Sequence, residues 1–409
     1  MTRETQPFSA GPVPALHTAP VMMNAAHPVA GEDATRWANE AQHPLKTPGA
    51  YEWWYFHAIS AAGDGLIFAA FQGLPFQPPH LRSNRRSSSS ALEKRGDIDF
   101  SVPAPAAYLA AYQGGRKIAQ FLNIYPSDST FAPTMGIADI RIGPNRITFR
   151  HDGSIGIIAK GYPYDIAHGH PRHRPDQVLS AQLDYTPSFM VPPHHRPFRA
   201  PNANGAMHHW ILSAPHGQLT GNVQVVDTRE NISLHDLPIN TLGYHDHVYG
   251  QGNLADGIAK QLWGFLQGET WTAVWHQTIY KHATPHANGL VLFERDRKSV
   301  IVEAPESTLD QYQVGRWLSR YPGRIAMHGS DEKGHPIEMI LTHDAMLDGA
   351  PFHTGLSARG TITIPGRGSY TGVGASHSLQ LRRLRWPVLS DVTLLAITLV
   401  QRDDPLWQQ

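Results

Sequence analysis

The sequence contains no cysteine, so disulfides, thiolate nucleophiles and cysteine-ligated zinc are all excluded. It is also poor in charge: only 17% of the 409 residues are charged, and 34 basic residues balance 34 acidic ones. Electrostatic binding of nucleic acid needs clustered positive charge, so a chain without net charge argues against that partner. Low charge together with 41% hydrophobic residues is typical of a folded chain.

Long apolar runs are missing as well. The first 45 residues are rich in proline and alanine and lack the apolar core of a signal peptide, and no later run is long enough to span a bilayer. We therefore expect a cytoplasmic protein, although an apolar substrate could bring it into peripheral contact with a membrane. The sequence also lacks a P-loop, a glycine-rich dinucleotide fingerprint and the Gly-x-Ser-x-Gly elbow of α/β-hydrolases.

From residue 51 onward, the chain consists of short runs in which the residues alternate between two faces. These runs are rich in aromatic and β-branched residues, and Gly, Pro, Asp and Asn separate them. This pattern predicts an all-β barrel or sandwich. Residues 52–71 and 262–280 form a weak internal repeat, each an aromatic strand, a glycine-containing turn and an apolar strand. We therefore predict a flexible segment over residues 1–45, an N-terminal β domain over 46–240 and a C-terminal β domain over 241–409.

The run Tyr51-Glu52-Trp53-Trp54-Tyr55-Phe56-His57 places an acid in an apolar setting. In a strand, Glu52 shares a face with Trp54 and Phe56. A carboxyl group in such a place must be paired, protonated or open to a cavity. Two interpretations stay open: Glu52 pairs with an arginine at the rim of a barrel, or it is a functional group with a raised pKa.

Two further clusters carry titratable side chains. In Met207-His208-His209-Trp210, an extended chain places His208 and Trp210 on one face. His208 is either a buried histidine satisfied by the backbone or a functional one. In Gly243-Tyr244-His245-Asp246-His247-Val248-Tyr249-Gly250, Tyr244 and Asp246 face one way, and His245 and His247 the other. Such a density of polar groups is unusual for a core and indicates a functional role.

The same histidines raise the possibility of a metal site. His245 and His247, with His208 or His209, have spacing that zinc or iron can use. Since the chain has 25 histidines, chance clusters are expected, and we predict no metal. Aromatic residues instead indicate a pocket for a large apolar ligand such as a polyene. Aromatic faces also stabilise a carbocation through the ring quadrupole. The tryptophans concerned are Trp53, Trp54, Trp210, Trp263, Trp271 and Trp275.

Taken in order, the three motifs resemble the carotenoid 1,2-hydratases, also called hydroxyneurosporene synthases, which are tandem lipocalin-like proteins related to Diels–Alderase-type cyclases. The resemblance spans roughly residues 50 to 400. It implies two lipocalin-like β-barrels side by side, a ligand cavity near their junction, and addition of water to a terminal double bond without any cofactor. It also implies Asp246 as the acid, Tyr244 as its neighbour, and His208 and Trp210 as the matching pair.

The sequence departs from the family at two points. Val248-Tyr249-Gly250 stands where Asn-Trp-Gly is usual after Asp-His, and His245 replaces a residue that is commonly apolar. The wall that meets the substrate is therefore expected to differ. A cyclase or pericyclase acting on another polyene, and a non-catalytic lipid or pigment carrier, stay open as alternatives.

The resulting hypothesis is proton-initiated addition or cyclisation at a carbon–carbon double bond of an apolar polyene or terpenoid. Protonated Asp246 donates to the alkene, Trp210 and Trp54 shield the cation, and His208 or His247 orients water or returns the proton. The substrate-binding residues expected besides this catalytic set are Glu52, Trp54, His247, Trp263 and Trp275.

Overall fold

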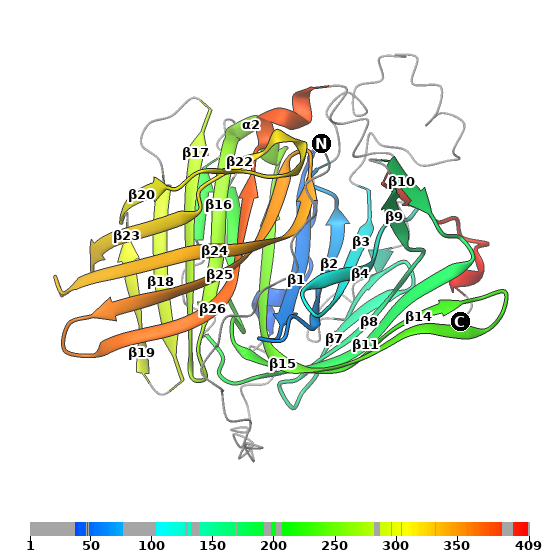
Figure 1. Ribbon diagram of the computed structural model, residues 1–409, viewed down its shortest axis with the longest axis horizontal. Helices are drawn as coiled ribbons and strands as arrows, with labels where there is room; N and C mark the ends of the chain where they lie inside the picture. The colour runs from blue at the N-terminus through cyan, green and yellow to red at the C-terminus, as the bar shows by residue number, and fades with distance from the viewer. Residues whose placement is uncertain are drawn as a thin grey trace.

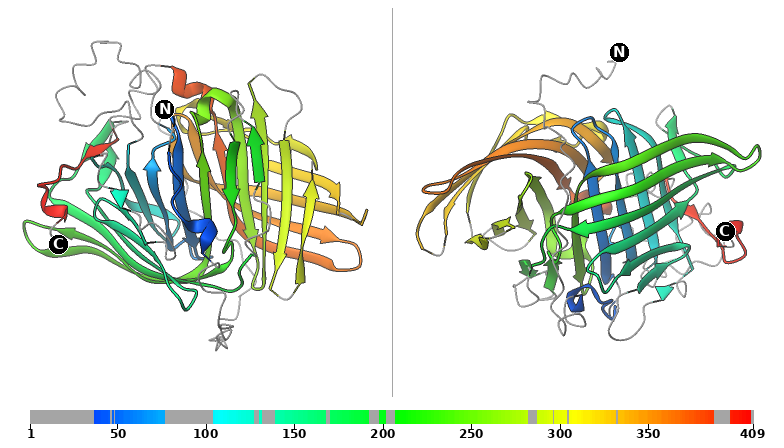
Figure 2. Two further views of the ribbon diagram at one scale, coloured as in Figure 1. Left: turned by 180° about the vertical axis from the view of Figure 1, so that it is seen from behind. Right: turned by 90° about the horizontal axis from the view of Figure 1, so that it is seen from below.

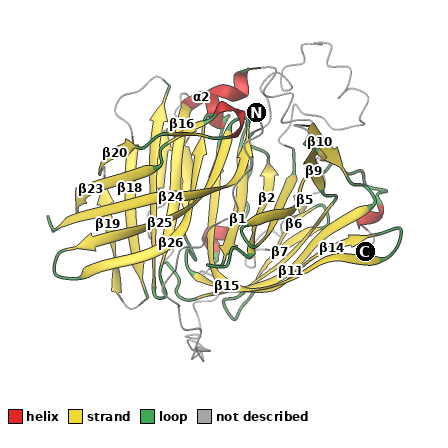
Figure 3. Cartoon of the chain, in the orientation of Figure 1, coloured by secondary structure: helices red, strands yellow, loops and turns green. Residues whose placement is uncertain are grey.

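The protein is built almost entirely of β-strands, as Figures 1 and 3 show for a computed structural model. The structure describes residues 37–45, 47, 49–76, 104–126, 130–131, 139–167, 170–191, 198–201, 207–281, 287–295, 297–303, 305–331, 333–386 and 396–407. Two large curled sheets lie side by side (Figure 2). The predicted all-β fold class with two barrel-like halves is therefore confirmed. No helix among the described residues is long and apolar enough to cross a membrane.

The first sheet contains fourteen strands. Along its main path the order is β27-β4-β3-β2-β1-β15-β14-β11-β8-β7-β6-β5, and β13 pairs with β12 and β15. Its strands are β1 Tyr51–Ile59, β2 Gly65–Gly73, β3 Ala106–Gln113, β4 Arg116–Ile124, β5 Thr130–Phe131, β6 Asp139–Ile142, β7 Asn145–Phe149, β8 Ile155–Gly161, β11 Gln177–Pro187, β12 Phe198–Pro201, β13 Met207–Ile211, β14 Gly217–Asp227, β15 Ile232–Gly250 and β27 Thr398–Leu399. A separate ribbon pairs β9 Tyr164–Ala167 with β10 His170–His173.

The second sheet contains nine strands in the order β19-β18-β17-β16-β26-β25-β24-β23-β20. They are β16 Ile258–Gln267, β17 Trp271–Tyr280, β18 Ala287–Glu294, β19 Arg297–Glu303, β20 Glu306–Asp310, β23 Arg324–Ser330, β24 Pro336–Ala350, β25 His353–Ile364 and β26 Gly368–Leu379. Short elements complete the chain: β21 Gln313–Val314, β22 Arg320–Tyr321, α2 Leu254–Gly257, and the 3-10 turns η1 Ala38–Glu40, η3 Arg316–Leu318, η4 Leu381–Arg385 and η5 Pro405–Trp407. The two segments of the weak repeat form the hairpins β1–β2 and β16–β17.

Three apolar cores follow from the alternation of side chains on these strands. Each sheet packs a core inside its own curl, and a third core fills the junction between the sheets. On β1, Trp54 and Phe56 enter the first sheet's own core, whereas Trp53 and Tyr55 enter the junction. Strand β1 thus supplies one wall of the junction.

The strand β15 runs across the predicted domain boundary between residues 240 and 241. Its first part pairs with β14 and its last part with β1, so the whole strand belongs to the first sheet. The short helix α2 then leads into β16 of the second sheet. The two-domain division stays a prediction, and we propose the α2 turn as its boundary.

The segment predicted to be flexible, residues 1–45, lies outside the described residues up to position 36. Its last part is described and packs against the first sheet. Trp37 and Glu40 are buried there, and the Trp37 ring contacts Phe149 of β7. This segment therefore covers part of the first sheet's core.

Candidate functional site

Asp246 lies on β15 at the junction and accepts two hydrogen bonds on one carboxylate oxygen. Trp210 Nε1 and Tyr244 Oη each donate to Asp246 Oδ2 over 2.8 Å. Asp246 is 1% exposed, and its other carboxylate oxygen, Oδ1, has no hydrogen-bond partner among the described residues. Three of the four residues predicted as catalytic therefore form one hydrogen-bonded group.

The surroundings of Asp246 favour its protonated form. Burial raises the pKa of the Asp246 carboxyl to about 7, although the bonds from Tyr244 and Trp210 stabilise the charged form and oppose the shift. Because Oδ2 already accepts two hydrogen bonds, a proton is best placed on Oδ1. Since no acceptor in the described part of the chain holds Oδ1, a proton there is available for donation.

The fourth predicted residue, His208, lies close by but does not contact Asp246 through a hydrogen bond. Its Nδ1 is 2.6 Å from Tyr51 Oη, and its Nε2 is 3.5 Å from Gln261 Nε2. Burial lowers the pKa of His208 to about 3, so the ring is neutral at pH 7. A neutral ring with both nitrogens in contact with polar groups fits the interpretation as a satisfied buried histidine.

A cavity of about 180 Å³ opens in the junction beside this group. Residues of both sheets line it, and the lining is mostly apolar. Its aromatic and polar lining residues include Trp53, Tyr55, Tyr108, Trp263, Asp348, His353 and His377. Asp246 is not among the lining residues. Two lining residues adjoin the Asp246 group instead: Tyr55 is the register partner of Asp246 on β1, and the Trp263 ring lies 5.3 Å from that of Trp210.

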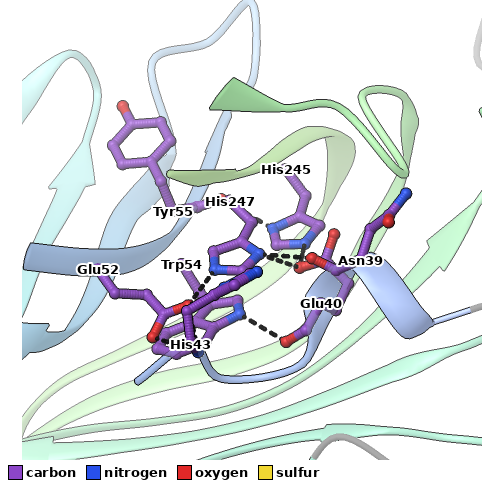
Figure 4. A network of polar contacts seen from close by, with 8 residues as sticks. All are labelled: Asn39, Glu40, His43, Glu52, Trp54, Tyr55, His245 and His247. Carbon is purple, nitrogen blue, oxygen red and sulfur yellow. Dashed lines mark hydrogen bonds and ion pairs between the residues drawn. The ribbon is translucent and has the colours of Figure 1, made fainter. Parts of the chain in front are cut away.

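Three residues expected at the substrate lie instead on the opposite face of the first sheet. Figure 4 shows Glu52, Trp54 and His247 together, with Tyr55 pointing the other way. Trp54 belongs to the first sheet's own core, and its ring stacks on His247 at 4.8 Å. None of the three lines the junction cavity, so Trp54 is not placed to shield a cation there, nor is His247 placed to orient water.

Glu52 is fully buried but pairs with histidines rather than with an arginine. The backbone N–H of His43 lies 3.0 Å from each Glu52 carboxylate oxygen, His43 Nδ1 is 2.7 Å from Oε1, and His247 Nε2 is 2.9 Å from Oε1. Burial opposes charge on His247, but its bond to Glu52 and the charge of Glu40 outweigh this and raise its pKa. A second buried carboxylate, Glu40, lies 3.3 Å from His245 Nε2. These groups form an internal ion network.

His43, Glu52 and His247 are the described residues whose geometry comes nearest to a metal site, since their ligand atoms lie within 4.8 Å of one another. The histidine set considered as a possible metal site, His245 and His247 with His208 or His209, does not converge in this way. However, the contacts of 2.7 and 2.9 Å are shorter than the roughly 3.3 Å between ligand atoms around tetrahedral zinc. The spacing is that of hydrogen bonds. The absence of a metal stays a prediction that elemental analysis of purified protein tests.

The two tryptophans of the second sheet that are expected at the substrate lie on opposite faces of that sheet. Trp263 of β16 lines the junction cavity, and its ring stacks on His377 at 4.2 Å. Trp275 of β17 is fully buried in the second sheet's own core, away from the cavity. The register of β16 and β17 pairs Trp263 with His276, and so gives Trp275 the other face.

The cavity also has polar residues that were not among the predicted site residues. Tyr55, His377, His353 and Asp348 come from β1, β26, β25 and β24. Only Tyr55 lies within a motif, on the face that it shares with Trp53. The others are isolated in sequence, and no local pattern distinguishes them.

Changing Glu52 to glutamine is expected to lower the free energy of unfolding by about 2 kcal/mol, because the amide loses charge-assisted bonds to His43 and His247. Substrate affinity should stay within twofold of the wild type, since Glu52 does not face the cavity. Urea unfolding and KM measure the two effects. A fivefold higher KM with unchanged stability would restore Glu52 as a substrate-binding residue.

Comparison with known proteins supports the expected resemblance. A curated relative from Chlorobaculum tepidum, hydroxyneurosporene dehydrogenase, is 26% identical over 329 residues, which are 77% of this chain and 78% of the relative. No family model matches the chain.

Among solved structures, an AttH-like protein from Nitrosomonas europaea superposes with a TM-score of 0.53 at 15% identity, over 84% of this chain and 95% of that one. This likeness supports the lipocalin-like fold. Kievitone hydratase from Nectria haematococca gives a TM-score of 0.48 at 10% identity, over 84% of this chain and 94% of that one.

Proposed function

We propose that the protein is a cofactor-independent hydratase that adds water to a terminal carbon–carbon double bond of an acyclic carotenoid or related polyene. The observation that carries the proposal is the buried Asp246 carboxyl beside an apolar cavity, with no described residue hydrogen-bonded to its Oδ1. The similarity to a protein named for hydroxyneurosporene supports the substrate class. The cavity is smaller than the roughly 300 Å³ of usual ligand pockets, which suits one end of a long polyene.

In the proposed reaction, the Oδ1 proton of Asp246 passes to an alkene carbon. Trp210 and Tyr244 hold the carboxyl in place and stabilise the carboxylate that forms. The rings of Trp53, Tyr55 and Trp263 face the cation that develops on the neighbouring carbon. Asp246 does not itself line the cavity, and its hydrogen-bond partner Trp210 packs edge-on against the cavity-lining Trp263, with ring centroids 5.3 Å apart.

Hydration in D₂O with neurosporene as substrate tests the reaction type. Acid-catalysed hydration places one deuterium on the carbon next to the new hydroxyl-bearing carbon. A product cyclised without deuterium would indicate a pericyclase, and binding without any product would indicate a carrier. Either outcome would contradict the proposal.

The rate of hydration is expected to be constant below pH 7 and to fall about tenfold per pH unit above it, because the acid must be protonated and burial holds its pKa at about 7. Initial rates from pH 5 to 9, with binding measured separately, check this. A rate that rises with pH through 7 would contradict Asp246 as the acid.

A further inference from the structure

Three hydrogen bonds form a continuous chain along one wall of the cavity. His57 Nδ1 lies 2.9 Å from Tyr55 Oη, Tyr55 Oη lies 2.9 Å from His377 Nε2, and His377 Nδ1 lies 2.9 Å from His353 Nε2. The chain begins on β1 of the first sheet and ends on β26 and β25 of the second. It therefore crosses the junction at the cavity.

Packing holds the members of this chain in place. The His377 ring stacks on Trp263 at 4.2 Å and 16°, and it lies nearly parallel to the His353 ring, at 5.2 Å and 11°, to which it is hydrogen-bonded. The Tyr55 ring meets both Trp263 and His377 edge-on. Tyr55, His377 and His353 all line the cavity, so their polar atoms are both fixed and adjacent to a bound substrate.

A buried negative charge lies at the His353 end. Asp348 lies close enough to His353 for their charges to interact, and each favours the charged form of the other. Asp348 is itself held by Lys117 Nζ, by Tyr108 Oη at 2.5 Å, and by the backbone N–H of Gly349 at 2.8 Å. A proton that arrives on His353 is therefore placed beside a carboxylate.

With one choice of histidine tautomers, all three hydrogen bonds can point the same way, so that each group donates to the next one along the chain. His57 Nδ1–H donates to Tyr55 Oη, Tyr55 O–H donates to His377 Nε2, and His377 Nδ1–H donates to His353 Nε2. Burial lowers the pKa of His57 to about 3 and also lowers those of His377 and His353, so the rings are neutral and each has one nitrogen lone pair. Each group from Tyr55 onward can then pass on one proton as it receives another.

We propose that Tyr55 is the proton-accepting group of the reaction, and that His377 and His353 relay the proton toward Asp348. This inference rests on the proposed hydration and adds its second half. Asp246 supplies the proton that starts the reaction, and a separate hydroxyl takes the proton that the attacking water must lose. The cavity thus has an acid behind one wall and a base on the wall itself.

A C–H bond forms as Asp246 loses its proton, and the lone pair of water forms a C–O bond with the cation. The added oxygen loses a proton to Tyr55 Oη as the Tyr55 proton passes to His377 Nε2, and the Nδ1 proton of His377 passes to His353 Nε2. The alkene and water become an alcohol, Asp246 is left as a carboxylate, and His353 is left as an imidazolium until a proton returns through solvent.

The test uses the full-length protein with neurosporene in D₂O and measures two rates: deuterium exchange into recovered alkene, and hydration. Tyr55→Phe and His353→Gln remove the accepting hydroxyl and the protonatable end of the relay. Asp246 still forms the cation in both variants, but water capture is not completed, and the cation returns to alkene. We expect hydration to fall about 100-fold and the ratio of exchange to hydration to rise at least tenfold.

The matched control is Tyr125→Phe, which removes a buried hydroxyl that accepts a hydrogen bond from Asn145 in the first sheet's own core. The ratio of exchange to hydration in this variant should equal that of the wild type. If exchange and hydration fall in proportion in the relay variants, the chain only positions the cavity wall and the proposal is wrong. Unchanged hydration overturns it equally. If Tyr55→Phe does not fold, the ratio in His353→Gln decides. If wild-type product contains no deuterium, the hydratase proposal fails first, and this inference fails with it.

Discussion

Asp246→Asn is expected to reduce the hydration rate by about three orders of magnitude. The amide has the shape of the carboxyl group, and its oxygen can still accept from Trp210 and Tyr244, but it has no acidic proton to donate. Product formation from neurosporene, followed by chromatography under single-turnover conditions, measures the effect. Affinity for the substrate should change little, because Asp246 does not line the cavity.

Stability separates loss of chemistry from loss of fold in this variant. The folded pKa of Asp246 is raised, so its carboxyl destabilises the protein progressively as pH rises from about 4 to about 7, and the penalty persists above that range. Asp246→Asn should therefore be at least as stable as the wild type at pH 8. The control Asp184→Asn changes a half-exposed carboxylate paired with Arg150 and should leave the rate unchanged. Normal turnover by Asp246→Asn would refute the acid assignment.

The second large effect concerns the ion pair that joins the two sheets. Lys117 of β4 contacts Asp348 of β24 at 2.5 Å, and their side chains are only 19% and 16% exposed. Lys117→Met leaves Asp348 charged and largely buried without its cation. We expect the free energy of unfolding to fall by about 3 kcal/mol, as measured by urea denaturation.

Two comparisons establish the cause of that loss. The double variant Lys117→Met with Asp348→Asn should recover most of the stability, because no unpaired charge remains. Arg359→Ala breaks an exposed pair with Asp344 and should cost less than about 1 kcal/mol. A loss below 1 kcal/mol for Lys117→Met would show that water or Tyr108 already compensates Asp348.

Alternation within a strand was sufficient to predict several features of the site. It grouped Tyr244 with Asp246, and His208 with Trp210, because residues two apart share a face. The pairing of β13 with β15 then brings Trp210 to the carboxyl, opposite Val248. Of the two interpretations left open for Glu52, the structure is nearer to the paired acid, but the partners are His43 and His247 in place of an arginine.

Alternation alone does not show which face of a strand meets the second sheet. Glu52, Trp54 and His247 were therefore assigned to the substrate, although they face the first sheet's own core. The relay of Tyr55, His377 and His353 is not predictable from the sequence for another reason. Tyr55 and His377 are 322 positions apart and meet only because the two sheets pack together. Local sequence patterns carry no information about such a contact.

The short strand β27 has a consequence for how the chain is made. Thr398 and Leu399 pair in parallel with Asn123 and Ile124, so a segment that follows the whole second sheet in the sequence completes the first sheet. The first half can therefore not close fully while the ribosome is still synthesising the second. Closure of this half is expected to follow synthesis of the second sheet and of β27, with the edge of β4 exposed to chaperones until then.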